Sequence, residues 1–430
     1  MRKILTYQEF VVEKYNAVHE NTQLILEGGA AGHMSHPFDN NNLTFGDFKT
    51  LIDACLRGEL NFEEEPTEKT DGQNLWATIQ DGEVKFARNT GETMNPMDLG
   101  QFKNKFEGHA SQMVQATFQL AAQDLADLLI KLPKDKQEQY FQNGKNFMNM
   151  ELIYSQNPNV IHYDVDAIQF HGIIETDGQG NKTGDQPNSG SELAKILKDV
   201  NANIGKTFTV IPPQIVKLGK DVYFDINKAK FIKKLEVLQN KYALSDGDPV
   251  SKYHEMWWRE QIDDTFPAAP QNVKDGLMLR WAFEDKKTLN MRSLEKEGLS
   301  KEQADAVKKF DKEDAKKKWK ENIRPFEDLF LELGSIVLKN ASNFVAANPS
   351  EEAQRLQSEL RREADKVKAN GDLSQIDKVE SELSRLERIG GLESILPTEG
   401  IVFRYKGHTY KLTGTFAALN QLMGLIKYAR

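Results

Sequence analysis

The stretch EKTDGQN at residues 68–74 decides how the rest of the sequence is interpreted. It runs into residues 75–79, where apolar and polar side chains alternate, and the same alternation returns at residues 83–87. The Asp81-Gly82 pair between them predicts a two-residue turn, so the two segments are predicted to form a hairpin. Lys69 therefore stands at the mouth of a sheet, with acids on both sides and a glycine that frees the backbone. This setting is suited to presenting an amine nucleophile to an electrophile.

Length and charge limit the classes of protein to consider. A chain of 430 residues can form a large core and two or three domains. The net charge of −9 excludes a global attraction to a polyanion, so any contact with nucleic acid would depend on local basic patches. The single cysteine, Cys55, excludes an internal disulfide and a cysteine-built zinc site. No apolar run has the length of a membrane span and no signal peptide is recognisable, so we expect a cytoplasmic protein.

Residues 1–60 are predicted to be helical around a glycine-rich loop at residues 27–39. Most loops of this composition are flexible connections. In the alternative interpretation, small residues such as Gly32 let backbone amides approach a phosphate, and His33 and His36 reach the same group. The two histidines have no third ligand beside them, which argues against a metal site. We favour a substrate or phosphate loop.

Periodicity and turn residues predict further elements along the chain. They are, in order, a helix at residues 7–19, a helix at 43–56 capped by Thr44, one or two helices in 97–131, strands at 165–174, 207–211 and 222–224, a polar turn region at 178–190, and a helical hairpin at 350–368 and 373–389.

Two later segments place charged residues in or beside strands. Residues 147–154 are predicted to form an apolar strand that Glu151 interrupts. A carboxylate inside an apolar strand is costly unless it meets a cation, a metal or hydrogen-bond donors, so Glu151 is a candidate site residue. Near the end of the chain, two strands are predicted around a turn at Lys406-Gly407, with Glu399 and Lys411 at their outer ends.

Taken in chain order, these residues resemble the motifs of covalent nucleotidyltransferases, the family of ATP-dependent DNA and RNA ligases and mRNA capping enzymes. The family's first motif, Lys-x-Asp-Gly, is met by residues 69–72, and its next, an arginine on the neighbouring strand, is met by Arg88. Its third motif, a glutamate before leucine, is met by Glu151. A following strand supplies an aromatic ring that stacks on the base, for which Phe170 is preferred and Tyr163 is the competitor.

The last two motifs of the family fall near the C-terminal end of the chain. EGIV at residues 399–402 resembles the fourth motif, and Lys411 resembles the fifth. The family often has a second lysine two residues further on, where this chain has Thr413. The fifth motif is therefore matched in part, and Lys406 is a candidate substitute for the second lysine.

The resemblance implies an α+β protein with an antiparallel-sheet nucleotidyltransferase core of the ATP-grasp-like ligase type. It covers residues of about 60–175 and 395–425, and it is nearest to RNA-ligase-like proteins of phages, which would place the protein in the host cytoplasm. The expected organisation is an N-terminal helical segment at residues 1–60, the two parts of the core at 61–190 and 391–430, and a large helical insertion at 191–390.

The resemblance also implies roles for single residues, with ATP and Mg²⁺ or Mn²⁺ as cofactors. Lys69 would be the nucleophile that takes AMP from ATP, and Asp71 and Lys411 would assist it. The nucleotide would be bound by Glu68, Arg88, Glu151, Phe170 and Lys411, and the metal by Glu151 and Glu399. Attack requires a neutral amine, although free lysine has a pKa of about 10.4, so we expect Arg88, Lys411 or a metal to lower the pKa of Lys69.

The implied substrate is a polynucleotide with a 5′-phosphate end and a 3′-hydroxyl end. Only nineteen residues follow Lys411, too few for the oligonucleotide-binding barrel that nick-sealing DNA ligases and capping enzymes usually carry there. We therefore favour RNA over DNA. A DNA nick ligase, a GTP-using capping enzyme and a non-catalytic nucleotide- or nucleic-acid-binding module remain open as alternatives.

A lysine-rich segment at residues 308–320 is the one candidate for a nucleic-acid patch, with Lys316, Lys317 and Lys318 at its centre. Interleaved acids make a solvated helix face the preferred interpretation. The alternative is a phosphate-tracking surface on which Trp319 and Trp257 or Trp258 stack bases.

Overall fold

The computed structural model describes residues 34–109, 111–156, 161, 163–179, 182–202, 207–344, 349–370, 376–389, 391 and 398–428. The expected helix at residues 7–19 lies outside these ranges. The described chain divides into two compact units. Of the described residues, the first unit contains those within 35–59 and 220–333, and the second unit contains residue 34 and those within 60–219 and 334–428.

The second unit is built on an open sheet in the order β3-β2-β4-β5-β6, and β7 pairs with the other end of β5. Neighbouring strands are antiparallel except for the parallel pair of β5 and β7. The strands are β2 (Gln73–Gln80), β3 (Glu83–Ala87), β4 (Asn146–Ile153), β5 (Ala167–Thr176), β6 (Lys182–Gln186) and β7 (Thr209–Ile211).

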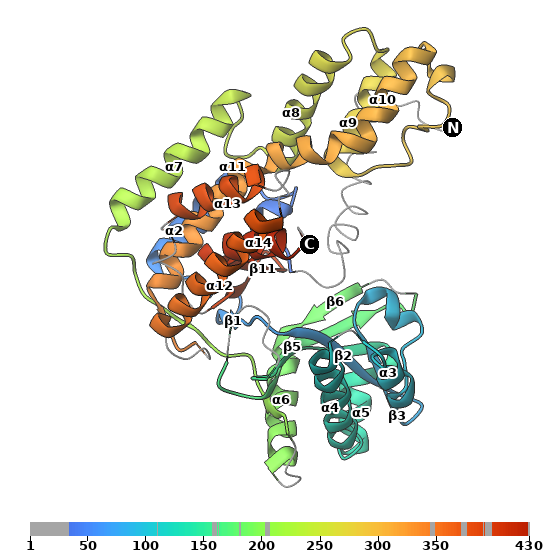
Figure 1. Cartoon of the computed structure of the whole chain (residues 1–430), viewed down its shortest axis with the longest axis vertical. Coiled ribbons are helices and arrows are strands. Elements are labelled where there is room, and N and C mark those ends of the chain that lie inside the picture. The colour runs from blue at the N-terminus through green and yellow to red at the C-terminus, as the bar shows by residue number, and fades with distance from the viewer. Residues whose placement is uncertain are drawn as a thin grey trace, which may run out of the picture. The chain divides into compact units, whose positions relative to one another are not determined.

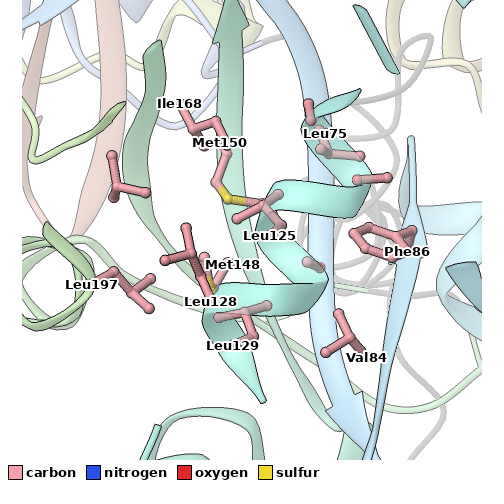
Figure 2. Close-up of a cluster of buried hydrophobic side chains, with 14 of the residues drawn as sticks. Leu75, Val84, Phe86, Leu125, Leu128, Leu129, Met148, Met150, Ile168 and Leu197 are labelled. Carbon is pink, nitrogen blue, oxygen red and sulfur yellow. The ribbon is translucent and has the colours of Figure 1, made fainter. Parts of the chain in front are cut away.

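Helices cover one face of this sheet (Figure 1). Figure 2 shows Leu125, Leu128 and Leu129 of one helix lying over Met148 and Met150 of β4. Because side chains alternate along a strand, this packing assigns every second residue of β2 and β4 to an apolar core, together with Ile168, Phe170 and Ile173 of β5. The covering helices are α3 (Leu99–Lys105), α4 (Gln112–Leu129), α5 (Lys134–Phe141) and α6 (Pro187–Ala202).

A smaller antiparallel sheet in the second unit joins distant parts of the chain, in the order β1-β10-β11. Its strands are β1 (Thr67–Lys69), β10 (Gly400–Tyr405) and β11 (His408–Thr413). The short strands β8 (Lys217–Leu218) and β9 (Ala341–Ser342) form a separate pair. Apolar residues of α12 (Pro349–Asn370), α13 (Ile376–Arg388) and α14 (Thr415–Tyr428) form one cluster with Ile153 and Ala167 of the larger sheet.

The first unit is helical where it is described. Phe45 and Phe48 of its first helix contact Phe326, and Phe48 also contacts Phe330. Thr44 caps that helix through a hydrogen bond from the Asp47 backbone, as predicted. The helices are α2 (Phe45–Arg57), α7 (Phe224–Lys241), α8 (Val250–Thr265), α9 (Gln271–Phe283), α10 (Lys301–Glu313) and α11 (Ala315–Lys339), whose last residues belong to the second unit.

Short 3₁₀ helices complete the described elements: η1 (Pro37–Asp39), η2 (Thr90–Met94), η3 (Gln142–Gly144) and η4 (Leu294–Glu297). None of the helices within the described ranges combines the length and the apolarity needed to cross a membrane.

The mixed helix and antiparallel-sheet architecture agrees with the predicted α+β class. Both hairpins are confirmed at their turns, where Asp81, Gly82, Lys406 and Gly407 all have positive φ. The two helices in residues 97–131 and the helices on both sides of residues 371–375 are also confirmed.

Two local predictions were wrong. Residues 178–190 are not a turn region throughout, because β6 pairs with β5 and α6 begins at Pro187. Residues 222–224 are not a strand but lead into α7. The units also divide the expected insertion differently, since residues 191–219 and 334–390 group with the sheets and only residues 220–333 group with the first unit. The apolar faces of α12 and α13 explain this grouping, because they pack against α14.

Candidate active site

Lys69, Glu151 and Glu399 meet in the second unit although Glu151 lies 82 positions and Glu399 lies 330 positions after Lys69 in the sequence. Lys69 Nζ donates a hydrogen bond to Glu399 Oε2 at 2.7 Å and lies 3.5 Å from Glu151 Oε1. Lys69 ends β1, Glu151 lies in β4, and Glu399 directly precedes β10. Their side chains are 11%, 14% and 17% exposed, so the cluster is enclosed but reaches solvent.

Two glycines allow this approach. A Cβ at Gly72 would lie 2.8 Å from the Glu151 Cβ, and a Cβ at Gly400 would lie 2.4 Å from the Leu412 carbonyl oxygen. Both distances are too short for any other residue. Gly72 thus brings the segment after Lys69 against β4, and Gly400, which pairs with Lys69, brings β10 against β11.

Glu151 is the centre of a hydrogen-bond network. Its Oε2 accepts a hydrogen bond from Thr70 Oγ1 at 2.6 Å, and His171 Nε2 lies 3.3 Å from the same oxygen. Burial alone would raise the pKa of Glu151. The charge of Lys69, the interaction with His171 and the hydrogen bond from the Thr70 hydroxyl outweigh the effect of burial and lower the pKa well below its usual range. Glu151 is therefore a carboxylate.

The surroundings of Lys69 correct one expectation. Burial lowers the pKa of Lys69, but the charges of Glu151 and Glu399 outweigh it and raise the pKa above that of free lysine. We predicted that neighbouring cations would lower this pKa, and that prediction was wrong because the closest charged neighbours are acids. In this structure Lys69 is an ammonium ion.

Glu399 behaves differently from Glu151 although both contact Lys69. Burial raises the pKa of Glu399 to about 7, and the negative charges of Glu151 and Asp71 act in the same direction. Lys69 lowers this pKa but does not outweigh the other effects. The acids outnumber the cation, so one of them binds a proton more readily than a free carboxyl group does.

Asp71 holds the loop that faces the site. Its Oδ2 accepts a hydrogen bond from the Ile161 backbone at 2.8 Å, and its own N–H donates to the Tyr163 hydroxyl at 2.9 Å. Burial and the nearby charge of Glu68 raise the pKa of Tyr163, which keeps the hydroxyl neutral. Asp71 and Tyr163 therefore position the segment that follows Lys69. Glu68 is fully buried, and because side chains alternate along β1 it points to the face opposite Lys69.

The structure does not bring Arg88 or Phe170 to this cluster. The Arg88 guanidinium carbon lies 4.2 Å from the centre of the Phe118 ring, among the helices on the packed face of the larger sheet. Phe170 is fully buried in the same apolar core. Alternation along β5 directs Phe170, and alternation continued past the end of β3 directs Arg88, to the face of the sheet that the helices cover. Glu151 points to the opposite face, which we call the site face.

Lys411 lies on the same face of the small sheet as Lys69 but one step further along. The register joins Lys69, Gly400 and Thr413 in one row and Thr67, Val402 and Lys411 in the next. Strand geometry then separates the Cα atoms of Lys411 and Lys69 by roughly 12 Å. Lys406 cannot stand in for a second lysine, because it lies in the turn at the far end of the hairpin.

The remaining candidates lie elsewhere. Gly32 and His33 lie outside the described residues. His36 belongs to the first unit, where its ring stacks on Phe38 and its backbone N–H donates to Asp39.

The lysine-rich candidate patch is also in the first unit. Lys316 and Lys317 are exposed, whereas Lys318 is paired with Glu321 at 2.8 Å. Trp257 and Trp258 are buried, so they are not available to stack bases as the alternative required.

The described residues contain no cluster of three or more His, Cys, Asp or Glu side chains arranged to hold a metal ion. Two carboxylates within reach of one Nζ nevertheless suit Mg²⁺, which often takes one or two protein carboxylates and completes its shell with water and phosphate oxygens. The donor set of Glu151 and Glu399 therefore fits such an ion only together with a substrate.

Sequence reasoning missed three residues of the site. Thr70 and His171 contact Glu151, and Gln169 is its direct neighbour on β5. Counting strand parity from Glu151 would have selected Gln169 and His171 in place of Phe170.

Comparison of the chain with protein-family models, curated proteins and solved structures found no match in any of the three.

Proposed function

We propose that the protein is a covalent nucleotidyltransferase that acts through Lys69, and specifically an ATP-dependent polynucleotide ligase with RNA as the preferred substrate. The observation that carries the proposal is the contact of Lys69 Nζ with Glu151 and Glu399. Enclosing a lysine and two acids costs desolvation free energy that the same charges would not cost at the surface. The cluster therefore does not serve stability, which supports a chemical use for it.

The reaction that fits this cluster transfers a nucleotidyl group to an amine. Lys69 Nζ would attack the α-phosphorus of ATP, a P–N bond would form, and the bond to the bridging oxygen would break to release pyrophosphate. The amine must lose a proton before or during attack, and Glu399 Oε2 is its nearest acceptor at 2.7 Å. Glu151, fixed by Thr70 and His171, would then keep Lys69 in line.

A divalent ion is part of the proposal. Glu151 and Glu399 would hold Mg²⁺ or Mn²⁺ together with phosphate oxygens, and the ion would neutralise charge on the triphosphate. Lys411, on the same face of the small sheet as Lys69, would contact a more distant phosphate. Arg88 is not assigned a nucleotide contact, because its guanidinium packs on Phe118.

The second and third steps make the protein a ligase. The AMP on Lys69 would pass to a 5′-phosphate end, and a 3′-hydroxyl would then displace AMP to join the two ends. RNA is the preferred substrate because the motifs resemble most closely those of RNA-ligase-like proteins.

Incubation with α-labelled ATP and Mg²⁺ tests the first step. The expected result is a label on the protein that survives denaturation and alkali but is released by acid, as a P–N bond is. Lys69→Ala should abolish it. Lys85→Ala is the matched control, because Lys85 is also ion-paired on the larger sheet but lies outside the cluster.

The same preparation separates the alternatives. Transfer of label to 5′-phosphorylated RNA supports the RNA ligase, and transfer to nicked DNA alone supports a DNA ligase. Label from GTP but not ATP would indicate a capping guanylyltransferase. No label from either nucleotide would leave a non-catalytic binding module and would overturn the proposal.

A further inference from the structure

Gln169 is a buried amide with no partner among the described residues. It is 0% exposed, and neither Nε2 nor Oε1 makes a hydrogen bond there. Its register partner on β4 is Glu151, so its side chain lies on the site face. The amide is thus one strand away from the carboxylate that contacts Lys69.

The other buried glutamines among the described residues make hydrogen bonds. Gln137 donates to the Leu132 carbonyl oxygen at 2.8 Å, and Gln239 donates to Asp246 at 2.9 Å. Leaving a buried donor and acceptor both unpaired is unfavourable and rare in native proteins. An apolar side chain of similar size would fill the position better, which indicates that the amide is retained for a ligand.

The chemistry of the amide narrows the class of ligand. It offers a donor and an acceptor side by side, and the complementary group presents an acceptor beside a donor. The edge of adenine does so with its 6-amino group and an adjacent ring nitrogen, and glutamine is a common partner for that edge. Strand spacing places Gln169 about 5 Å from Glu151, and the sugar and base of a nucleotide whose α-phosphate meets Lys69 extend far enough to reach a neighbouring strand.

We propose that Gln169 recognises the polar edge of the nucleobase in the nucleotide that reacts with Lys69. This inference rests on the proposed function and adds a specificity residue to it. The ligand class is a purine nucleoside triphosphate with an exocyclic amino group at position 6.

A cycle that combines one protein variant with one altered nucleotide tests the inference. ATP is compared with purine riboside triphosphate, which keeps the sugar and phosphates but lacks the 6-amino group. Wild-type protein should label roughly 10- to 100-fold more slowly with the analogue, because one amide acceptor stays unpaired. In Gln169→Leu the two nucleotides should label at nearly equal rates.

Two controls make the result decisive. Gln137→Leu, which removes a satisfied buried amide, should keep the wild-type discrimination but lower the melting temperature. Gln169→Leu should leave the melting temperature of the free protein unchanged or raise it. Equal discrimination in wild type and Gln169→Leu, or a melting temperature lowered as in Gln137→Leu, would overturn the inference alone. Wild-type protein that labels with neither nucleotide would overturn the proposed function as well.

Discussion

Lys69 in the second unit and His254 in the first unit are both buried basic side chains, but their surroundings act on them in opposite ways. In the second unit Lys69 is kept charged, because Glu151 and Glu399 outweigh the effect of burial. In the first unit His254 is kept neutral. Burial lowers the pKa of His254 to about 4, and its nearest partner, Asn322 Oδ1 at 2.7 Å, opposes that effect only weakly.

This difference in surroundings distinguishes His254, whose role is in packing, from Lys69, which is a candidate for chemistry. His254 and Asn322 sit among Tyr253 and Phe326, where a neutral imidazole packs like an aromatic ring. Lys69 is enclosed with an excess of acids that no packing requirement explains. Burial with opposite charges at a solvent-reaching position marks a candidate site, whereas burial with a neutral partner marks a core.

The largest expected effect is on the stability of a Lys69→Met variant. Removing the cation leaves Glu151 and Glu399 enclosed without a counter-charge, which should destabilise the second unit by about 3 kcal/mol. Denaturant unfolding followed by circular dichroism measures it. Adding Glu399→Gln should recover part of the loss, and a Lys69→Met variant as stable as Lys85→Met would contradict the account of the cluster.

The next effect is the pH dependence of the first unit. Unfolded histidine has a pKa near 6.5, above that of folded His254, so the unfolded state binds more protons at low pH. Stability contributed by neutral His254 is therefore present above about pH 6.5 and is lost as the pH falls toward 4, by roughly 3 kcal/mol.

Tryptophan fluorescence can follow this loss, because four of the five tryptophans lie in the first unit. The unfolding free energy of wild type should fall more steeply with decreasing pH than that of His254→Gln, which has no imidazole to protonate. Exposed His109→Gln is the control and should retain the wild-type profile. Parallel profiles for wild type and His254→Gln would show that the imidazole does not stay neutral.

A smaller effect is expected when the support of Glu151 is weakened. Thr70→Val removes the 2.6 Å hydrogen bond to Glu151 Oε2, and a hydrogen bond to a charged group contributes about 2 kcal/mol. Thermal unfolding should show this loss for Thr70→Val and a smaller one for exposed Thr50→Val. Equal losses would mean that Thr70 does not orient Glu151.

The smallest effect is expected for exposed basic charges. A Lys316→Ala, Lys317→Ala, Lys318→Ala triple variant should change stability by less than about 0.5 kcal/mol, since these lysines cover no core. The salt dependence of RNA binding should also stay unchanged if this is a solvated helix face. A fall of about 2 in the log–log slope would instead establish a phosphate-tracking surface.

Much of the local structure follows from sequence alone. The turn residues Asp81-Gly82 and Lys406-Gly407 predicted both hairpins, and their positive φ angles agree with that prediction. Glu151 was identified because it is an acid within an apolar strand. Glycines at positions 72 and 400 are necessary because strands approach each other there, a contact that only the fold displays.

Which face a side chain occupies was harder to predict. The pairing of β4 and β5 shifts register between Asn149 and Met150, and aromatic character directed attention to Phe170 although Gln169 and His171 share the parity of Glu151. Arg88 continues the packed face of Val84 and Phe86, and its apolar surroundings come from helices far along the chain. Local pattern does not specify such contacts.

The central claim is that Lys69 Nζ forms a covalent bond to a nucleotide, and peptide mapping by mass spectrometry tests it most directly. Wild-type protein incubated with ATP and Mg²⁺, then digested at alkaline pH, should yield the peptide that contains Lys69 with AMP attached. An adduct on another lysine, or none under conditions that leave the protein folded, would contradict the account.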